Sequence, residues 1–279
     1  MPPDVTRRPT TAVRVRAWDG RALRDKPDRV VTEEPMEIRI GGPAAAPQPL
    51  VVIMRTPGHD FELAAGFCFT EGIIEDLTDL TEVRYCVGPD AQQEYNVVTV
   101  ATRRPVNLDG RERGFVSSSS CGVCGKQSLD QLEVMCAPLG GGPQVSLRTL
   151  AGLPDALRTQ QSVFDATGGL HGAALCSAAG EVELVREDVG RHNAVDKLIG
   201  NAVLANRVPL SEAVLVVSGR LSFEIVQKAA RAGITVTVAV SAPSSLAVAT
   251  AERVGMTLVG FVRDGRANVY AGASRVEVS

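Results

Sequence analysis

The second half of the chain, from about residue 161 to 279, alternates short apolar strands with helices of about a dozen residues. The runs A-V-L-V-V-S from Ala213 and I-T-V-T-V-A-V from Ile234 are short and rich in β-branched residues, as buried strands are. Segments with apolar residues at helical spacing precede and follow them, at residues 192–206, 223–232 and 244–254. This alternation predicts a mostly parallel sheet covered by helices, and so restricts the fold to the α/β class.

In such a sheet, the turns that follow the strands gather at one edge, where ligands bind. Here those turns are polar and rich in glycine: E-D-V-G-R-H-N (187–193), S-G-R-L-S (218–222), S-A-P-S-S (241–245) and G-F-V-R-D-G-R (260–266). Three of them hold arginine beside glycine, which combines bidentate phosphate recognition with a close backbone approach. Helix N-termini would add positive partial charge. Any one of these turns could be an ordinary surface loop. Because several of them share this composition, we expect that they bind an anionic ligand, of which a nucleotide is one class.

The first half of the chain follows a different sequence pattern. Short β-branched runs broken by glycine, proline and aspartate predict a β-rich subdomain, interrupted by one helix from about Asp60 to Ile74. The expected division of the chain is a disordered N-terminus (1–12), the β-rich subdomain (13–116), a mobile loop (117–126), a helical connection (127–160) and an α/β domain (161–279).

The mobile loop carries the most reactive pattern in the sequence. Residues 117–125 read S-S-S-S-C-G-V-C-G, so Cys121 and Cys124 stand at C-x-x-C spacing among residues that offer no apolar surface. Such a dithiol binds a metal, cycles as a disulfide, or carries sulfur as a persulfide. Of the other cysteines, Cys136 is ambiguous, and three lie among apolar residues and are expected in the core: Cys68, Cys86 and Cys176.

A metal site is the weakest of the three interpretations. Zinc needs four ligands, yet the sequence has no second C-x-x-C and its three histidines are scattered. The stretch G-G-L-H-G-A around His171 is similar to half of the zinc deaminase signature, but Ala173 replaces the catalytic glutamate and no P-C-x-x-C follows. We therefore expect no metal and no deaminase activity. A tuned redox couple needs a rigid loop, whereas four serines favour a flexible carrier, so the redox interpretation comes second.

Composition excludes several other classes. A net charge of −3 and 4% aromatic residues argue against binding to nucleic acid. No apolar run approaches the roughly 20 residues of a membrane helix, and the N-terminus has no secretory signal. The expected compartment is the cytoplasm.

The chain resembles the FdhD/NarQ family of sulfur carrier proteins required for formate dehydrogenase activity. The C-x-x-C motif alone would not identify the family, but the matching stretches taken together are specific for it, and they extend over most of the chain. They are 56–74 (T-P-G-H-D-F-E-L-A-A-G-F-C-F-T-E-G-I-I), 119–126 (S-S-C-G-V-C-G-K), 167–174 (T-G-G-L-H-G-A-A), 187–200 (E-D-V-G-R-H-N-A-V-D-K-L-I-G), 218–229 (S-G-R-L-S-F-E-I-V-Q-K-A), 241–247 (S-A-P-S-S-L-A) and 260–270 (G-F-V-R-D-G-R-A-N-V-Y).

This resemblance implies a sulfurtransferase that takes persulfide sulfur from a cysteine desulfurase and passes it to molybdopterin guanine dinucleotide (Mo-bis-MGD), the cofactor of formate dehydrogenase. Cys121 would carry the sulfur, with Cys124 as its partner. The family's cofactor-binding stretch falls on Phe261, Val262, Arg263, Asp264, Gly265 and Arg266, to which we add Arg220 and His192 from neighbouring turns.

The resemblance also implies a cytidine-deaminase-like mixed sheet covered by helices, α+β overall, and a cytoplasmic homodimer. Two alternatives remain open at this point. One is a chaperone that binds the cofactor while its thiols are incidental, and the other is a C-x-x-C dithiol redox protein.

Overall fold

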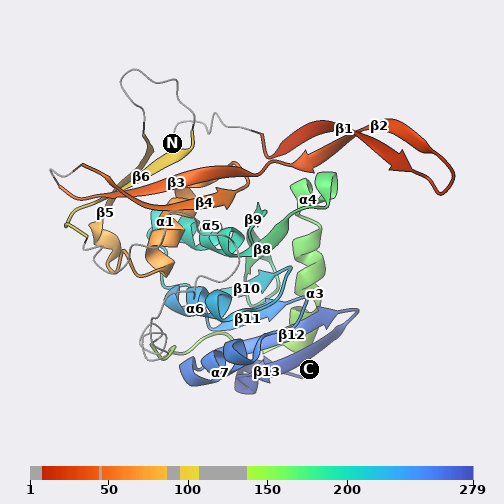
Figure 1. The fold of residues 1–279 in the computed structure, drawn as a ribbon. Helices are drawn as coiled ribbons and strands as arrows, with labels where there is room; N and C mark the ends of the chain where they lie inside the picture. Colours follow the sequence, from red (N-terminus) through yellow and green to blue (C-terminus); the bar gives the residue numbers. More distant parts are fainter. Residues whose placement is uncertain (1–7, 44–45, 87–94, 107–136, 279) are drawn as a thin grey trace.

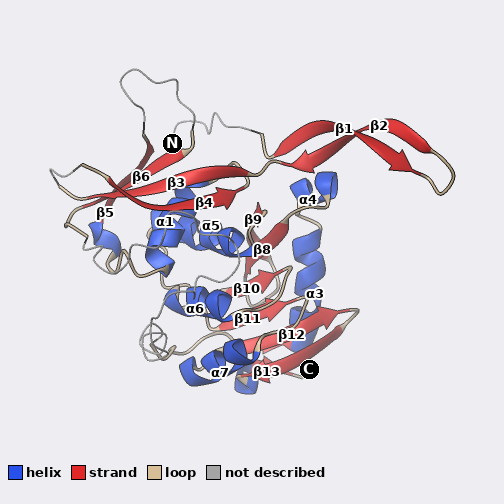
Figure 2. Ribbon diagram, viewed as in Figure 1, coloured by secondary structure: helices blue, strands red, loops and turns tan. Residues whose placement is uncertain are grey.

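The computed structural model describes residues 8–43, 46–86, 95–106 and 137–278. The dithiol loop, with Cys121 and Cys124, lies outside these residues, as do Cys136 and the first part of the expected helical connection. Figures 1 and 2 show two sheets with helices between and around them, and a long hairpin that projects from the body. The expected α+β class, a mixed sheet under helices with a smaller β-rich N-terminal part, is confirmed.

The larger sheet has six strands in the order β13-β12-β11-β10-β8-β9. Its parallel part is confined to β10, β11 and β12, and the outer pairs are antiparallel. The prediction of a mostly parallel sheet was therefore wrong, because tight turns join β8 to β9 and β12 to β13, and such turns connect only antiparallel neighbours. The strands are β8 (His171–Cys176), β9 (Val182–Asp188), β10 (Val214–Val217), β11 (Val236–Ala239), β12 (Thr257–Arg263) and β13 (Arg266–Ala271).

Helices cover both faces of this sheet. Leu215 and Val217 of β10 face one core with α5 (Arg191–Leu204), α6 (Phe223–Arg231) and α7 (Ser245–Val254). Val214 and Val216 face the other core, against α3 (Leu147–Arg158). The helices predicted at 192–206, 223–232 and 244–254 are thereby confirmed, and the Ser244 hydroxyl caps α7 by accepting from the Ala247 amide at 3.2 Å. A short helix, α4 (Ser162–Thr167), had no counterpart in the sequence analysis.

The smaller sheet has the order β4-β3-β6-β5 and packs on α1 (Asp60–Thr70). Its strands are β3 (Glu34–Gly41), β4 (Gln48–Arg55), β5 (Leu80–Tyr85) and β6 (Val97–Thr102). The helix ends four residues before the predicted Ile74, because Gly72 adopts a left-handed φ of 68° and the amide of Ile74 turns back to the Cys68 carbonyl. Since α1 also contributes Ala65 and Phe69 to the core of the larger sheet, it joins the two halves of the molecule.

The projecting hairpin consists of β1 (Thr10–Trp18) and β2 (Leu23–Val31), which pair along their whole length. The expectation of disorder over residues 1–12 therefore extends too far, because Thr10 already pairs with Val31. Two short strands, β7 (Val145–Ser146) and β14 (Val276–Glu277), pair with each other in parallel near the C-terminus. No helix in the described part of the chain is long and apolar enough to cross a membrane.

Charged side chains hold α1 against β9 and α5. The Glu62 carboxylate accepts bonds from Arg186 Nε at 2.5 Å, Arg186 Nη2 at 2.7 Å and Asn201 Nδ2 at 2.9 Å. Burial alone would raise the pKa of Glu62, but the bonds from Arg186, His59 and Asn201 outweigh it and lower the pKa from 4.5 to about 2. The carboxylate is thus strongly favoured in its charged form in the folded protein.

This shift predicts acid sensitivity of the fold. Because the pKa is lower in the folded state, the stabilisation is complete above pH 4.5 and is lost as the pH falls from 4.5 towards 2. Its size is about 3 kcal/mol. We expect Glu62→Gln to lower the free energy of unfolding at pH 7 and to flatten its dependence on pH in this window. Urea denaturation at pH 3, 5 and 7 measures both, and parallel pH profiles for the two proteins would contradict the prediction.

Candidate functional site

The four polar turns singled out in the sequence meet at one edge of the larger sheet. Leu221 of the turn after β10 donates its amide to Ala242 at 3.2 Å, and its carbonyl accepts from Ser244 at 2.9 Å. The amide of Phe261, in the turn region of β12, donates to the Ser241 carbonyl at 3.2 Å. A side-chain contact connects the turn after β9 to the same edge: His192 Nε2 lies 3.3 Å from Ser222 Oγ. The prediction that these turns gather is confirmed.

A buried carboxylate fixes the turn that precedes α5. Asp188 at the end of β9 accepts from the Gly190 amide at 2.8 Å and from Asn193 Nδ2 at 2.8 Å, and pairs with Lys197 Nζ at 2.7 Å. All of these groups lie inside the protein, and Asp188 has no exposed surface. Asp188 is thus structural, and it sets where α5 begins and where His192 stands.

His192 connects the first turns of α5 and α6. Its Nε2 lies 3.3 Å from Ser222 Oγ and 3.7 Å from the Glu224 carboxylate. The bond from His192 is the main cause that lowers the pKa of Glu224 to about 2. Since His192 and Glu224 are 18% and 24% exposed, a ligand at the edge can reach them. His192 was among the site residues predicted from the sequence, and Ser222 was not.

His171 stands at the same edge, at the start of β8 and opposite Asp188. Burial lowers the pKa of His171, and the nearby charge of Arg191 and of His192 lowers it further, so the neutral imidazole is favoured. Arg191 places its Nε inside the protein without a hydrogen-bond partner. The similarity of the sequence around His171 to a deaminase motif was the signal that marked this position.

The stretch 261–266 forms the end of β12 and the turn into β13, and its residues differ in what they offer. Phe261 is 39% exposed, while Val262 has no exposed surface and packs in the core, so only its backbone is available to a ligand. Asp264 and Gly265 make the turn with left-handed φ values of 53° and 70°. Glycine suits this conformation because it has no Cβ.

Three exposed arginines at this edge have no carboxylate partner among the described residues: Arg220, Arg263 and Arg266. Buried arginines behave differently here, since Arg55 pairs with Asp60 at 2.8 Å and Arg186 pairs with Glu62. An unpaired guanidinium on the surface is free to bind phosphate or carboxylate groups. The edge therefore has the charge and the access that an anionic ligand needs.

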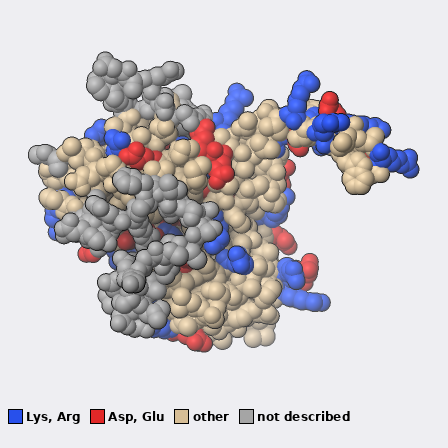
Figure 3. Space-filling view, viewed as in Figure 1, with Lys and Arg blue, Asp and Glu red and all other residues tan. Residues whose placement is uncertain are grey.

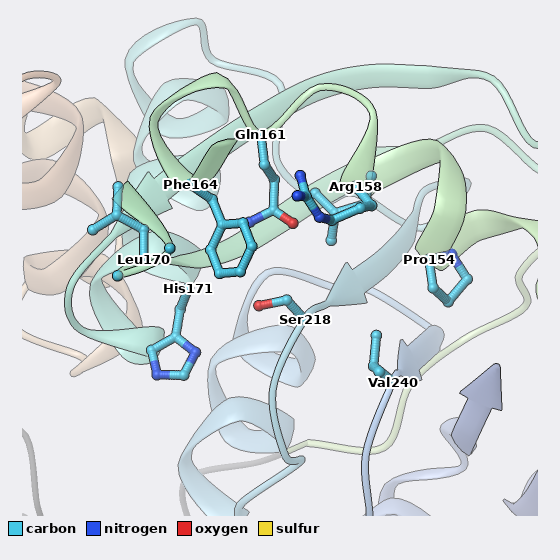
Figure 4. A pocket seen from close by; sticks show the side chains of 11 residues that line it. Pro154, Arg158, Gln161, Phe164, Leu170, His171, Ser218 and Val240 are labelled. Atoms are coloured by element: carbon cyan, nitrogen blue, oxygen red, sulfur yellow. The ribbon is translucent and has the colours of Figure 1, made fainter. Parts of the chain in front are cut away.

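A pocket of about 480 Å³ opens beside this edge, between the α3–α4 segment and the strand ends (Figure 4). Apolar walls come from Pro154, Leu157, Phe164, Leu170 and Val240, and polar groups come from Arg158, Gln161, His171 and Ser218. His171 and Ser218 thus belong to both the edge and the pocket. No local pattern in the sequence predicts this pocket, because its lining comes from segments that meet only in the fold.

The remaining cysteines offer no competing sulfur site among the described residues. Cys68 and Cys176 are fully buried free thiols, as predicted, and burial raises the pKa of Cys176 to about 12. Cys86 is only half-buried, because it follows the end of β5 rather than lying within a core strand. Within residues 8–43, 46–86, 95–106 and 137–278, no group of three or more metal-ligating side chains is arranged to hold a metal.

Taken together, these features define an α+β protein with a mixed sheet, and its polar carboxyl edge with the adjacent pocket is the candidate ligand site. Residues 31–277 match the FdhD/NarQ family, and the chain belongs to that family. It is 52% identical over 269 residues to a Streptomyces coelicolor protein named sulfur carrier protein FdhD, covering 94% of this chain and 93% of that one. A protein of the same name from Saccharolobus solfataricus is 40% identical, covering 94% and 96%. 

A solved structure supports the same assignment. The crystal structure of a putative formate dehydrogenase accessory protein from Desulfotalea psychrophila superposes with a TM-score of 0.74 at 25% identity. The superposition covers 96% of this chain and 99% of that one, so the two proteins share their fold over nearly the whole chain.

Proposed function

We propose that this protein is a sulfur carrier that accepts persulfide sulfur from a cysteine desulfurase on Cys121 and transfers it to molybdopterin guanine dinucleotide for formate dehydrogenase. The observation that carries the proposal is the near full-length similarity to relatives named sulfur carrier proteins, together with the S-S-C-G-V-C-G-K stretch at 119–126. The protein would act in the reducing cytoplasm, where a dithiol stays available.

The sulfur step needs only thiol chemistry. The Cys121 thiolate attacks the terminal sulfur of the donor persulfide, a new S–S bond forms, and the donor cysteine leaves as its thiolate. Release of that sulfur as sulfide takes two electrons. The Cys124 thiol supplies them by forming a disulfide with Cys121, and a cellular thiol reductant then restores the pair. Both cysteines therefore have distinct expected roles.

The cofactor is the substrate of this step, and the edge of the larger sheet fits its chemistry. The unpaired guanidinium groups of Arg220, Arg263 and Arg266 suit the phosphates of a dinucleotide. His171 on β8 lies three strands from β12, which at the usual strand spacing is about 14 Å. A ligand that contacts His171 and Arg263 together must be elongated, which a guanine dinucleotide is.

Mass spectrometry after incubation with a cysteine desulfurase and cysteine tests the carrier function. We expect an adduct of about 32 Da, one sulfur atom, on Cys121. The Cys121→Ala variant is expected to lose it completely, whereas the buried Cys176→Ala variant should retain it and so serves as the control. Absence of any adduct on the wild-type thiols, with cofactor binding retained, would favour the chaperone alternative. A Cys121–Cys124 disulfide formed without release of sulfide would favour the redox alternative, because the carrier step forms that disulfide only together with sulfide.

The homodimer is also part of the proposal, and the projecting hairpin supports it. A two-stranded hairpin alone is only marginally stable in water, yet this one exposes Trp18 at 72% and Leu23 at 54%. Between residues 8 and 32 there are seven basic and three acidic residues, while residues 33–279 hold 21 basic and 28 acidic ones. Basic side chains cluster along the hairpin in Figure 3. The hairpin of one copy is thus complementary in charge to the body of another.

Replacing both exposed apolar residues, as Trp18→Asp with Leu23→Asp, is expected to convert the dimer into a monomer. Light scattering on a sizing column should give about twice the 29.4 kDa chain mass for the wild type and the single mass for the variant. The exposed Leu246→Asp variant, on the body, is the matched control and should stay dimeric. A wild-type protein that runs as a monomer at micromolar concentration would refute the dimer.

A further inference from the structure

The projecting hairpin lies directly beside one wall of the pocket. Its second strand, β2, packs on α4, and Figure 1 shows α4 next to the point where the hairpin joins the body. A Cβ added at Gly169 would stand 3.3 Å from Cγ1 of Val31, so the last side chain of β2 rests on the backbone that follows α4. A bond between the Thr11 and Thr32 hydroxyls at 2.8 Å closes the base of the hairpin next to this contact. The hairpin and the pocket therefore share α4 and the residues that follow it.

The position of α4 depends on its neighbours. A helix of six residues is too short to be stable alone. Its start is capped from another element, because the Glu187 carboxylate on β9 accepts from the amides of Val163 and Phe164 at 3.0 and 2.8 Å. At its other end, Gly168, with a left-handed φ of 69°, and Gly169 lead into β8. Glu187 on one side and the base of the hairpin on the other thus help to hold α4 in place.

The same short segment shapes the pocket. The Phe164 ring on α4 and Gln161 at its start line the cavity, and Leu170 and His171 line it just after the two glycines. Arg158, at the end of α3, lies over the Phe164 ring at 4.6 Å and lines the cavity too. A change in the position of α4 therefore changes the walls around a bound ligand.

The hairpin needs a partner to hold its shape. β1 and β2 form a sheet of their own, which no third strand of the described residues joins, and residues 23–30 of β2 are all exposed. Such a hairpin is only marginally stable in water, whereas docking on the acidic body of a second copy would fix it. In a single copy, Val31 is held only as firmly as the hairpin itself, so α4 loses part of its support. The ligand must then order α4 as it binds, and that cost weakens its affinity.

We propose that α4 couples dimerisation through the hairpin to ligand binding in the pocket. A copy whose hairpin is docked on its partner keeps α4 in place and binds the ligand more tightly than a single copy does. The inference rests on the proposed homodimer and the proposed cofactor-binding function, and it adds regulation of that site by assembly. Because such coupling is reciprocal and a homodimer has two pockets, saturating ligand must strengthen the dimer by the square of the affinity ratio.

Calorimetric titration of the full-length protein with GDP, which matches the guanosine diphosphate part of the proposed cofactor, tests the coupling. The monomer for comparison is the double variant Trp18→Asp with Leu23→Asp, whose two substitutions pair at the tip of the hairpin. We expect this variant to bind GDP about tenfold more weakly than the wild-type dimer does. Equal affinities would overturn the coupling and leave the cofactor site intact. Failure of the wild type to bind GDP would overturn both.

A substitution at the contact itself distinguishes a route through α4 from a direct contribution of the partner to the pocket. Val31→Ala removes the methyl groups that rest on Gly169, so the variant should stay dimeric in light scattering but bind GDP about fivefold more weakly. Val30→Ala is the matched control and should bind like the wild type, because Val30 is 43% exposed and points to the opposite face of the strand. A Val31→Ala dimer that binds GDP as tightly as the wild type would overturn the role of α4.

Combining the substitutions gives a second test of the route. If the monomer has already lost the support of Val31, adding Val31→Ala to the Trp18→Asp, Leu23→Asp variant should cost no further affinity for GDP. Fully additive losses would mean two independent effects and would overturn the role of α4. Thermal melting confirms that each variant is folded.

The reciprocal measurement needs no variant. Trp18 is the single tryptophan of the chain, so its fluorescence reports on the hairpin as the protein is diluted. A tenfold affinity ratio predicts that saturating GDP lowers the dissociation constant of the dimer about a hundredfold. A dissociation constant that GDP leaves unchanged would overturn the coupling.

An arginine variant separates the coupling from the cofactor site on which it rests. Arg266→Ala should weaken GDP binding in the dimer and in the monomer alike, and so leave the ratio of the two affinities unchanged. If Arg266→Ala does not change GDP binding, the assignment of the phosphates to this edge fails, while the ratio between dimer and monomer still decides whether α4 couples the two events.

Discussion

Replacing Gly200 with alanine is expected to destabilise the protein by about 3 kcal/mol, an overpacking cost. Gly200 lies on α5 where this helix crosses α1, and an added Cβ would stand 1.8 Å from the Glu62 carbonyl oxygen and 2.8 Å from the Gly66 amide. On the other helix, a Cβ at Gly66 would stand 1.9 Å from the Asp196 carbonyl oxygen. Both clashes are with backbone atoms of a helix, so no side chain can rotate away, and the helices must separate.

Thermal melting of the wild type, Gly200→Ala and a matched helical control measures this effect. For a chain of this size, about 3 kcal/mol corresponds to a midpoint lower by roughly 10 °C. Gly152 in α3 is the control, because it is exposed and a Cβ there would meet nothing within 4 Å. Gly152→Ala should be neutral or slightly stabilising, since alanine is the better helix former. If Gly200→Ala and Gly152→Ala melt at the same midpoint, α1 and α5 can move apart without loss of stability, and the prediction is wrong.

The crossing matters for function because α5 begins at the site. Arg191 and His192 form its first turn, and α1 contacts α5 more closely than it contacts any other helix. A shift of α5 along its axis would change the 3.3 Å contact between His192 and Ser222. Gly200→Ala should therefore also weaken ligand binding at the edge, even at temperatures where the variant remains folded.

Much of the larger domain could be predicted from the sequence because its elements follow simple rules. Buried strands of β-branched residues and amphipathic helices alternate there, so the helices α5, α6 and α7 and the gathering of their preceding turns were predicted. The antiparallel outer strands were harder. Strand pairing depends on which turn is tight, and the polar Asp264-Gly265 turn, which joins β12 to β13, has a composition that also suits a ligand-binding turn.

The candidate site could be predicted only in part, for physical reasons that particular residues illustrate. Arg263 and Arg266 stand in a turn that is visibly polar, so their exposure followed from the sequence. Gln161 follows Gln160 in a polar stretch, and nothing local shows that one is buried and the other exposed. Burial of Gln161 depends on Gly172, which is distant in sequence and adjacent only through the fold. The dithiol loop was identified from its C-x-x-C spacing and its serine and glycine neighbours, and it lies outside the described residues.

Buried charges were also hidden from sequence reasoning, since lysine and aspartate usually mark a surface. Lys228 of α6 is 4% exposed and donates to Asp196 of α5 at 2.9 Å, to Thr70 of α1 at 2.9 Å and to Glu71 at 3.1 Å. One ammonium group on α6 thus bonds to side chains of α5, of α1 and of Glu71, the residue that follows α1, and so joins three helices. Its loss leaves a buried carboxylate without a counter-charge.

We expect Lys228→Met to lower the free energy of unfolding by about 4 kcal/mol, because removal of one partner strands the Asp196 carboxylate inside the protein. Adding Asp196→Asn removes that stranded charge and should recover at least half of the loss, which urea denaturation of both variants would measure. Arg104→Met is the surface control. It breaks a pair with Asp79 at 2.6 Å whose arginine is 66% exposed, and it should leave the midpoint nearly unchanged.

The double variant decides between two explanations of this cluster. If stability depends mainly on the volume that Lys228 fills, the second substitution will not help, and both variants will denature at the same urea concentration. If it depends on charge compensation, the double variant will be the more stable of the two. Recovery in the double variant would mean that α1, α5 and α6 can pack without the ion pair. The ammonium group would then be needed because of the carboxylate, and the edge would keep its geometry in a protein that has neither charge.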